Sequence, residues 1–290
     1  MGWLRPLTAQ KRADDNSYDP SPFTLKMGTS SKSSYVAQKY DDMSIGEKTI
    51  LVVCTDDGKL EMKNGKVFNT GNHPVEMFVP MLHFRDAGFS FDIVTASGGP
   101  VVLEMWAYPE KDDNVKELHE SVKSMMEKPK KISDIEGIDE YSAIFIPGGH
   151  GAMKNLPTNV ELGKLLHLAH EKGLPTVTLC HGPATLLSTG LEGTGKSFAY
   201  KDYKSMCFTD KTDAMTPSFG YLPGHMPWKC QEAIEKEGIT VVNQKETGAV
   251  TQDRELITGD SPTAAHNLGV FAAPIVRKYV LDNKIGRAHV

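Results

Sequence analysis

Short apolar runs alternate with longer amphipathic stretches from Lys48 to the end of the chain. The runs are rich in β-branched residues and stop at glycine or polar residues, a pattern typical of strands that are buried on both faces of a parallel sheet. We predict such strands at residues 49–55, 89–97, 141–149, 176–180 and 239–243, with weaker runs at 203–208 and 248–259.

The amphipathic stretches between these runs predict helices, several of which end at a glycine that suits a helix C-cap. They cover residues 76–88, 160–173, 183–190, 229–238 and 261–280. Strands that alternate with helices in this way predict a doubly wound α/β fold with a mostly parallel sheet. The 290 residues are enough for one large domain of this kind with a smaller appendage.

Two segments depart from the alternation, and we expect them to form a small lid domain. Residues 1–46 are rich in serine, proline, lysine and aspartate without a sustained period, which predicts an irregular arm. Residues 98–138 place a charged helical stretch between two core strands and predict an inserted lid segment. The α/β core domain then comprises residues 47–97 and 139–290.

Composition narrows the possible partners. A net charge of −5, without a lysine- or arginine-rich stripe, argues against a nucleic-acid partner. The chain has no run of about eighteen apolar residues, so we expect no membrane partner. Its four cysteines show no C-x-x-C spacing, which indicates neither a zinc ribbon nor a disulfide framework. We therefore expect a cytoplasmic protein.

The stretch GLEGTGKS at residues 190–197 matches the phosphate-loop pattern G-x-x-x-x-G-K-S. A working phosphate loop follows a buried strand and opens a helix, so that its amides converge on a phosphate. Here the stretch follows a predicted helix and precedes SFAYKDY, which has no helical period. We predict a glycine-rich turn with Lys196 in solvent, and no nucleotide site.

Cys180 and His181 have the context that the phosphate-loop pattern lacks. Cys180 ends the buried strand TVTLC, Gly182 permits a sharp turn, and Pro183 suits the first position of a helix. This order resembles the strand–nucleophile–helix elbow of hydrolases, which presents the nucleophile at the carboxyl edge of the sheet. A helix N-terminus beside the sulfur would favour the thiolate. Cys180 is therefore the predicted nucleophile, and the other cysteines are expected to be ordinary thiols.

Two further features lie at predicted strand or helix ends. The turn IPGGHGA follows a buried strand, so the amides of Gly148 and Gly149 could form an oxyanion hole, although a plain tight turn explains them equally well. Glu76 falls in the first turn of a helix that begins at Pro74. A carboxylate there is also favoured by the helix dipole alone.

Several longer stretches resemble the ThiJ/PfpI superfamily, and more closely its HchA-type branch of heat-shock chaperones, also called glyoxalase III. The resemblance spans residues 14–279 and is carried by DNSYDPSPFTL, NGKVFNTGNHPVE, AIFIPGGHGA, TLCHGP, TPSFGYLPGH and RELITGDSP. It implies a flavodoxin-like fold of the class I glutamine amidotransferase type, a small domain over the site, and a homodimer.

The resemblance also implies roles for individual residues. Cys180 corresponds to the family's nucleophile, His181 to its catalytic histidine, and Asp210 to the acid paired with that histidine. Glu76 corresponds to the glutamate that contacts the sulfur and acts as acid and base. The amides of Gly149 and His181 resemble the family's oxyanion donors. Which of Glu76 and His181 takes the first proton stays open.

Bacterial relatives carry a His/Glu/His metal site, and this chain departs from it. Alignment by the flanking motifs puts Arg85, Ser90 and Val122 at those positions, and arginine and valine are not metal ligands. His83 and Asp92 lie nearby but do not complete a ligand set. We expect no metal and no other cofactor.

The resemblance favours a glyoxalase that converts methylglyoxal and similar 2-oxoaldehydes to 2-hydroxy acids through a Cys180 hemithioacetal, without glutathione or metal. Deglycation of proteins would use the same attack. A holdase chaperone that binds unfolded chains is one alternative, and a small-peptide amidase or aminopeptidase is another. Amidotransfer is disfavoured because no His-x-Glu pair follows Cys180.

Overall fold

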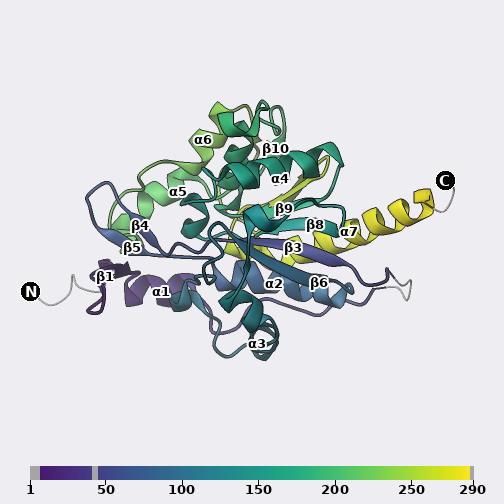
Figure 1. Ribbon diagram of the computed structural model, residues 1–290. Coiled ribbons are helices and arrows are strands. Elements are labelled where there is room, and N and C mark those ends of the chain that lie inside the picture. Colours follow the sequence, from purple (N-terminus) through teal and green to yellow (C-terminus); the bar gives the residue numbers. More distant parts are fainter. Residues whose placement is uncertain (1–6, 41–44, 288–290) are drawn as a thin grey trace, which may run out of the picture.

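A seven-stranded sheet organises the protein, as the computed structural model in Figure 1 shows. The structure describes residues 7–40 and 45–287. All neighbouring strands of this sheet are parallel except the first two in the order, so the predicted doubly wound, mostly parallel α/β fold is confirmed. The strand order is β12 (Val250–Asp253), β13 (Leu256–Gly259), β9 (Thr176–Leu179), β8 (Tyr141–Ile146), β3 (Thr49–Cys54), β6 (Ser90–Thr95) and β7 (Lys130–Lys131).

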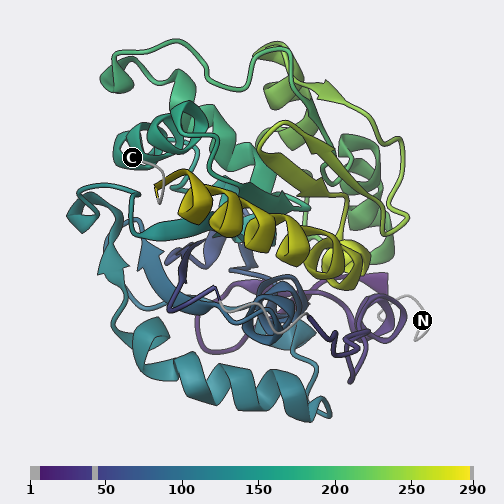
Figure 2. The same ribbon diagram turned by 90° about the vertical axis from the view of Figure 1, so that its right-hand side faces the viewer.

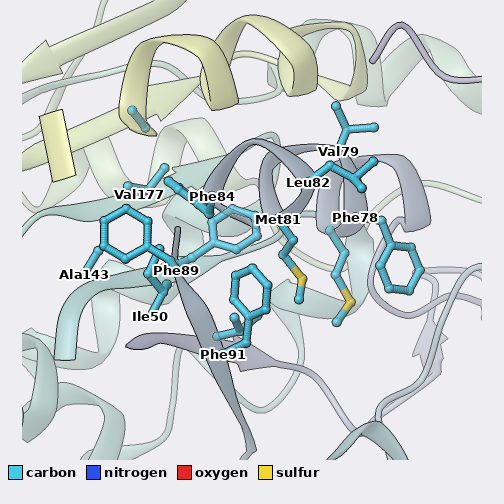
Figure 3. Packing of buried hydrophobic residues seen from close by; sticks show 14 of the residues in the cluster. Ile50, Phe78, Val79, Met81, Leu82, Phe84, Phe89, Phe91, Ala143 and Val177 are labelled. Carbon is cyan, nitrogen blue, oxygen red and sulfur yellow. The ribbon is translucent and has the colours of Figure 1, made fainter. Parts of the chain in front are cut away.

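Each face of the sheet has its own apolar core, because successive residues of a strand point to opposite faces. In β3, Ile50 and Val52 belong to one buried cluster and Leu51 and Val53 to the other. Figure 3 shows the first cluster, where Phe78, Leu82 and Phe84 of a helix pack over the strands. Burying both faces explains why these strands are continuous apolar runs.

Helices cover both faces. The first cluster is closed by α2 (Pro74–Asp86), α7 (Ala265–Arg287) and α3 (Asp113–Glu127). The second is closed by α4 (Val160–Glu171), α6 (Cys230–Lys236) and the 3₁₀ helix η5 (Gly182–Gly190). In Figure 1, α2 and α3 lie below the sheet and α4 and α6 above it, and Figure 2 shows α7 running across the molecule. The segment 183–190, expected to be an α-helix, is wound more tightly, as a 3₁₀ helix.

The N-terminal arm joins a second, smaller sheet. Its order is β1 (Gln10–Lys11), β2 (Tyr18–Asp19), β5 (Val67–Asn69) and β4 (Lys59–Glu61), and the arm continues into α1 (Pro22–Gly28). Two of the four strands thus come from the range 47–97 that was expected to be core. Parts of the expected arm, residues 1–6 and 41–44, lie outside the described residues.

The inserted segment 98–138 divides into two parts. Its charged helix is α3, which packs against α2 and β6, and β7 then extends the edge of the main sheet. The preceding loop and the 3₁₀ turn η2 (Met105–Ala107) instead reach the small sheet, where Nε1 of Trp106 donates to the carbonyl of Asn69. The first part of the segment thus meets the arm's sheet.

The run at 239–243 was wrongly predicted to be a core strand. Its central residues form β11 (Thr240–Val241), which pairs with β10 (Lys204–Ser205) in a separate two-stranded sheet. Thr240 and Val242 are exposed, so only one side of the run is covered. The remaining short elements are η3 (Ile132–Asp134), η4 (His150–Met153), η6 (Glu192–Thr194), α5 (Asp210–Met215), η7 (Thr216–Phe219) and η8 (Pro262–Ala264).

Among the described helices, none combines the length and the apolar character that a membrane crossing requires.

Candidate active site

Cys180 lies at a sharp turn between β9 and η5. Its φ of 57° is in the left-handed region, which costs a non-glycine residue roughly 1–3 kcal/mol and persists only where surrounding structure holds it. Two hydrogen bonds do so here, because the Cys180 amide donates to Gly259 O at 3.0 Å and its carbonyl accepts from Phe208 N at 2.9 Å. The predicted elbow is therefore present, and its thiol is buried, with 3% of the residue exposed.

His181 connects the thiol to a carboxylate. Its Nδ1 lies 3.3 Å from Cys180 Sγ, and its Nε2 lies 2.9 Å from Oδ2 of Asp213. The ring stacks on Phe208, with centroids 4.9 Å apart. Because an ionised carboxylate only accepts hydrogen bonds, Nε2 carries the proton and Nδ1 is the nitrogen that can accept one from the thiol.

Asp210 does not pair with His181, so that expectation is wrong. Its carboxylate accepts hydrogen bonds from the amides of Gln231 and Glu232, at 3.0 and 2.8 Å, and thereby caps the start of α6. Asp213, one turn further along α5, is the acid that reaches the histidine. The two acids are only three residues apart, and the sequence alone did not show which of them faces the site.

Asp213 has a second partner that the sequence did not predict. Its Oδ1 lies 2.9 Å from Nε2 of His150, the residue that follows the Gly148–Gly149 turn. Burial of Asp213 would raise the pKa of its carboxyl, but the charges and hydrogen bonds of His181 and His150 hold that pKa below its ordinary value. Asp213 is therefore an ionised carboxylate between two imidazoles.

Gly148 and Gly149 bring backbone close to the sulfur. A Cβ on Gly148 would collide with Oε2 of Glu76 and lie 2.8 Å from Cβ of Cys180. Gly149 has a φ of 98°, and a Cβ there would collide with the carbonyl of Gly71. The Gly149 amide faces the Cys180 thiol, where it acts to lower the thiol pKa against the larger effect of burial, which raises it. The turn can thus supply a hydrogen-bond donor at the sulfur.

Glu76 is fully buried in the first turn of α2, with neither carboxylate oxygen hydrogen-bonded among the described residues. Burial raises the pKa of this carboxyl well above its ordinary value, and the charge of Glu104 adds to the rise. Burial, and then the charge of Glu76, raise the pKa of the Cys180 thiol as well. The expectation that a helix N-terminus would favour the thiolate is thus outweighed by burial and by the charge of Glu76.

A second buried acid, Glu104, lies at the start of η2. Its Oε1 accepts a hydrogen bond of 2.7 Å from Thr70, and Oε2 has no partner among the described residues. Burial raises the pKa of Glu104 to about 7, although the charge of His150 acts in the opposite direction. The aromatic side chains of Phe68, Trp106 and Tyr221 pack together next to His150.

The structure thus brings together Cys180, His181, Glu76 and the Gly148–Gly149 turn, and leaves Asp210 outside. It adds Asp213, His150 and Glu104. Only His150 had a local signal, its place directly after two glycines at the end of a buried strand. Asp213 of α5 and Glu104 before η2 reach the site through tertiary packing between distant segments, which no local pattern reveals.

Among the described residues, His150, His181 and Asp213 are close enough to share a metal ion, with ligand atoms within 4.8 Å of one another. Each imidazole Nε2 is instead at hydrogen-bond distance from its own oxygen of Asp213. At the positions where the resemblance places the metal ligands of bacterial relatives, Arg85 pairs with Glu117, the Ser90 hydroxyl donates to Lys48 O, and Val122 is buried. These three residues do not fit a metal ion.

The phosphate-loop pattern forms a turn, as predicted. Residues 192–194 make one turn of 3₁₀ helix, Gly195 adopts a φ of 70°, and Lys196 pairs with Glu171 on the surface. No long helix opens at this point to direct amides at a phosphate.

Comparison with known proteins identifies relatives of this chain. Residues 67–216 match the DJ-1/PfpI family model. The protein/nucleic acid deglycase HchA of Pseudomonas aeruginosa is 40% identical over 267 residues, covering 90% of this chain and 92% of that protein. HchA of Escherichia coli O157:H7 is likewise 40% identical, over 266 residues, with the same coverage of both chains.

Solved structures agree on the fold. The crystal structure of glyoxalase III from Candida albicans superposes with a TM-score of 0.61 at 24% identity, covering 78% of this chain and 97% of that one. The rapid encystment protein of Francisella tularensis gives a TM-score of 0.65 at 20% identity, with 80% and 99% coverage. The resemblance found in the sequence is confirmed, and the chain belongs to the DJ-1/PfpI family.

Proposed function

We propose that this protein is a cysteine-dependent glyoxalase, which converts methylglyoxal and related 2-oxoaldehydes to 2-hydroxy acids without glutathione or a metal ion. The observation that carries the proposal is the geometry at Cys180, where a strained elbow holds the thiol 3.3 Å from His181 Nδ1 and against the Glu76 carboxyl. A nucleophile, a base with its orienting acid and a second acid/base group meet in one buried place.

The first step is attack of Cys180 on the aldehyde carbon. The thiol proton passes to Nδ1 of His181, and the carboxylate of Asp213 stabilises the imidazolium that forms. The new C–S bond turns the aldehyde oxygen into an oxyanion, for which the Gly149 amide is a hydrogen-bond donor. Protonation of that oxygen gives the hemithioacetal.

The second step moves a proton from the carbon bonded to sulfur to the neighbouring carbonyl carbon, through an enediol. This requires a group that can both take and return a proton near neutrality. The buried carboxyl of Glu76 suits the task, because its raised pKa brings it closer to neutral pH than an ordinary glutamate. His181 is the other candidate for this base. The product is a thioester.

Water then hydrolyses the thioester, which releases lactate and restores the Cys180 thiol. Over the whole cycle methylglyoxal gains one water molecule and no electrons are exchanged. Attack on an early methylglyoxal adduct of a protein or a nucleotide would follow the same first step. The HchA relatives are named protein/nucleic acid deglycases, which supports including deglycation in the proposal.

The test is lactate formation from methylglyoxal by the purified protein, with chelator present and glutathione absent. We expect turnover in the wild type and none in Cys180→Ala. Cys54→Ala is the matched control, because Cys54 is an equally buried thiol in β3, and it should keep the activity. Absence of lactate from a wild type whose Cys180 is shown to be reduced would contradict the proposal.

A holdase chaperone is a second candidate, favoured by one surface. Phe23 of α1 and Phe219 of η7 are each nearly half exposed. The two elements are neighbours, since the Thr24 hydroxyl of α1 donates a hydrogen bond to the carbonyl of Phe219. Met27, also on α1, and Met215, the last residue of α5 directly before η7, add further exposed apolar area. If this surface binds unfolded chains, Phe23→Ser with Phe219→Ser should abolish aggregation suppression, whereas Cys180→Ala should retain it.

Three further parts of the proposal concern the surroundings of the protein. We propose a homodimer, a cytoplasmic location, and a small domain formed over the site by the arm and part of residues 98–138. Light scattering of the purified protein would test the dimer, and limited proteolysis would test whether the arm stays on the body.

A further inference from the structure

His150 is buried beside the triad that Cys180, His181 and Asp213 form. Among the described residues, no hydrogen bond joins His150 to Cys180. His150 opens η4, directly after Gly149, and only 2% of it is exposed. Its Nε2 lies 2.9 Å from Oδ1 of Asp213, while His181 Nε2 lies 2.9 Å from Oδ2. The two histidines therefore hold the same carboxylate from its two oxygens.

The two imidazole rings also lie against each other. Their centroids are 4.0 Å apart, with an interplanar angle of 35°. A single carboxylate fixed by two donors has lost its freedom to rotate, so the oxygen that faces His181 is defined. Losing one donor would leave Oδ1 of Asp213 buried and unpaired, and the carboxylate would be free to turn.

We propose that His150 is a positioning residue of the active site, which fixes Asp213 for His181 and couples the Gly148–Gly149 turn to the base that deprotonates Cys180. His150 follows the Gly148–Gly149 turn in the chain and also bonds Asp213, so one residue holds both the turn at the sulfur and the acid that orients His181. This inference rests on the proposed function only where turnover is measured.

The charge on Asp213 follows from the same arrangement. Burial alone raises the pKa of the Asp213 carboxyl, and the two histidines lower it. Removing His150 leaves His181 as the one histidine of this pair that lowers the pKa of Asp213. That pKa should therefore rise, and the carboxylate should become protonated at a higher pH. The other titratable groups that surround the two histidines are His73 directly before α2, Glu76 of α2, Glu104 before η2, Tyr221 after η7, and Cys180.

The test compares two substitutions of different chemistry. His150→Leu keeps the approximate volume and removes the donor, whereas His150→Gln keeps an N–H group that can reach Asp213. His167→Leu is the matched control, because His167 is a buried histidine of α4 that is bonded to Thr189 O, away from Cys180. The first readout is the rate of iodoacetamide alkylation of Cys180 against pH, followed by mass spectrometry of its peptide.

This alkylation readout needs no turnover, so it judges the inference even if the protein forms no lactate. As the pH is lowered, alkylation of His150→Leu should slow at a higher pH than that of the wild type and become several-fold slower, because protonated Asp213 no longer supports proton transfer from the thiol to His181. His150→Gln and His167→Leu should follow the wild type.

The second readout is steady-state kinetics. His150→Leu should lower kcat by about 10-fold with little change in KM, since the residue orients the base and does not bind substrate. His150→Gln should recover most of the loss. Should His150→Leu fail to fold, His150→Asn replaces it, because its shorter amide cannot span to Asp213. Identical alkylation profiles and kcat values in the donor-lacking variant and the wild type would overturn the inference.

Discussion

Nε2 of His181 lies 2.9 Å from Oδ2 of Asp213, and this contact, at an acid three residues from the expected one, defines the triad. The acid expected from the sequence, Asp210, instead accepts hydrogen bonds from two amides in the first turn of α6. Which of the two acids belongs to the triad can be tested by making the same substitution at both positions.

Asp213→Asn should lower kcat by about 10²- to 10⁴-fold, because an amide can donate to His181 and so stabilise the tautomer whose Nδ1 is already protonated. Asp210→Asn should leave kcat within about twofold. Replacing Asp210 by alanine should instead lower the free energy of unfolding by about 1 kcal/mol, the usual effect of losing a helix cap. Equal losses of kcat in the two asparagine variants would return the catalytic role to Asp210.

The sequence allowed Cys180 to be predicted as the nucleophile, but it did not show which aspartate pairs with His181. Cys180 could be predicted because its signals are local, namely a buried strand before it and Gly182 and Pro183 after it. Its φ of 57° was not predictable, since the hydrogen bonds that hold it come from residues 208 and 259. The choice between Asp210 and Asp213 was equally nonlocal, because it depends on α6 capturing Asp210 from about twenty residues away.

The fold shows the same division. Continuous apolar runs predicted β3, β6, β8 and β9, the middle strands of the main sheet, because both faces of that sheet are covered. The weaker run at 248–259 was predicted as a single segment, but it forms the antiparallel pair β12 and β13. The run at 239–243 has the same composition, but its partner β10 belongs to another sheet, and pairing between distant segments leaves no local pattern. His150 was seen only as part of a glycine-rich turn, because its bond to Asp213 joins η4 to α5.

Glu76→Gln should separate the reactivity of the thiol from turnover. The substitution removes the negative charge that adds to burial in raising the pKa of Cys180, so alkylation of Cys180 at pH 7 should be no slower than in the wild type. Turnover should fall by about 10²- to 10⁴-fold, because an amide cannot take and return a proton. Parallel losses of alkylation and turnover would show instead that Glu76 acts through the thiol alone.

His83 provides a test of stability against pH outside the site. It is buried between α2 and α7, with Nε2 3.0 Å from Nδ1 of His266, and burial followed by the charge of His266 lowers its pKa to about 4. Because the unfolded chain takes up a proton near pH 6.5 and the folded one does not, this group destabilises the fold as the pH falls from 6.5 towards 4.

We therefore expect the wild type to lose more stability than His83→Phe between pH 7 and pH 5, by up to about 2 kcal/mol in urea unfolding. The raised carboxyls of Glu76 and Glu104 act in the opposite direction, but they are present in both proteins and cancel in the comparison. If the wild type and the variant lose the same stability between the two pH values, His83 takes up its proton at the same pH in the folded protein as in the unfolded chain.

Gly148 tests how tightly the site is closed around its reacting groups. A methyl group at this position would meet Oε2 of Glu76 and Cβ of Cys180, and neither neighbour can retreat easily because both are held in the buried core. Gly148→Ala should therefore displace the Glu76 carboxyl from the thiol and lower kcat by about 100-fold or more, with an overpacking cost of about 1–3 kcal/mol in stability.

Gly137→Ala is the matched control, because a Cβ there has nothing within 4 Å. It should leave kcat and the free energy of unfolding nearly unchanged. Measuring both kcat and the free energy of unfolding of Gly148→Ala also shows whether the backbone or the Glu76 side chain moves. A loss of stability with full activity would mean that the backbone moves to accept the methyl group while Glu76 and Cys180 stay together, and the proton transfer would then tolerate a looser turn than the structure implies.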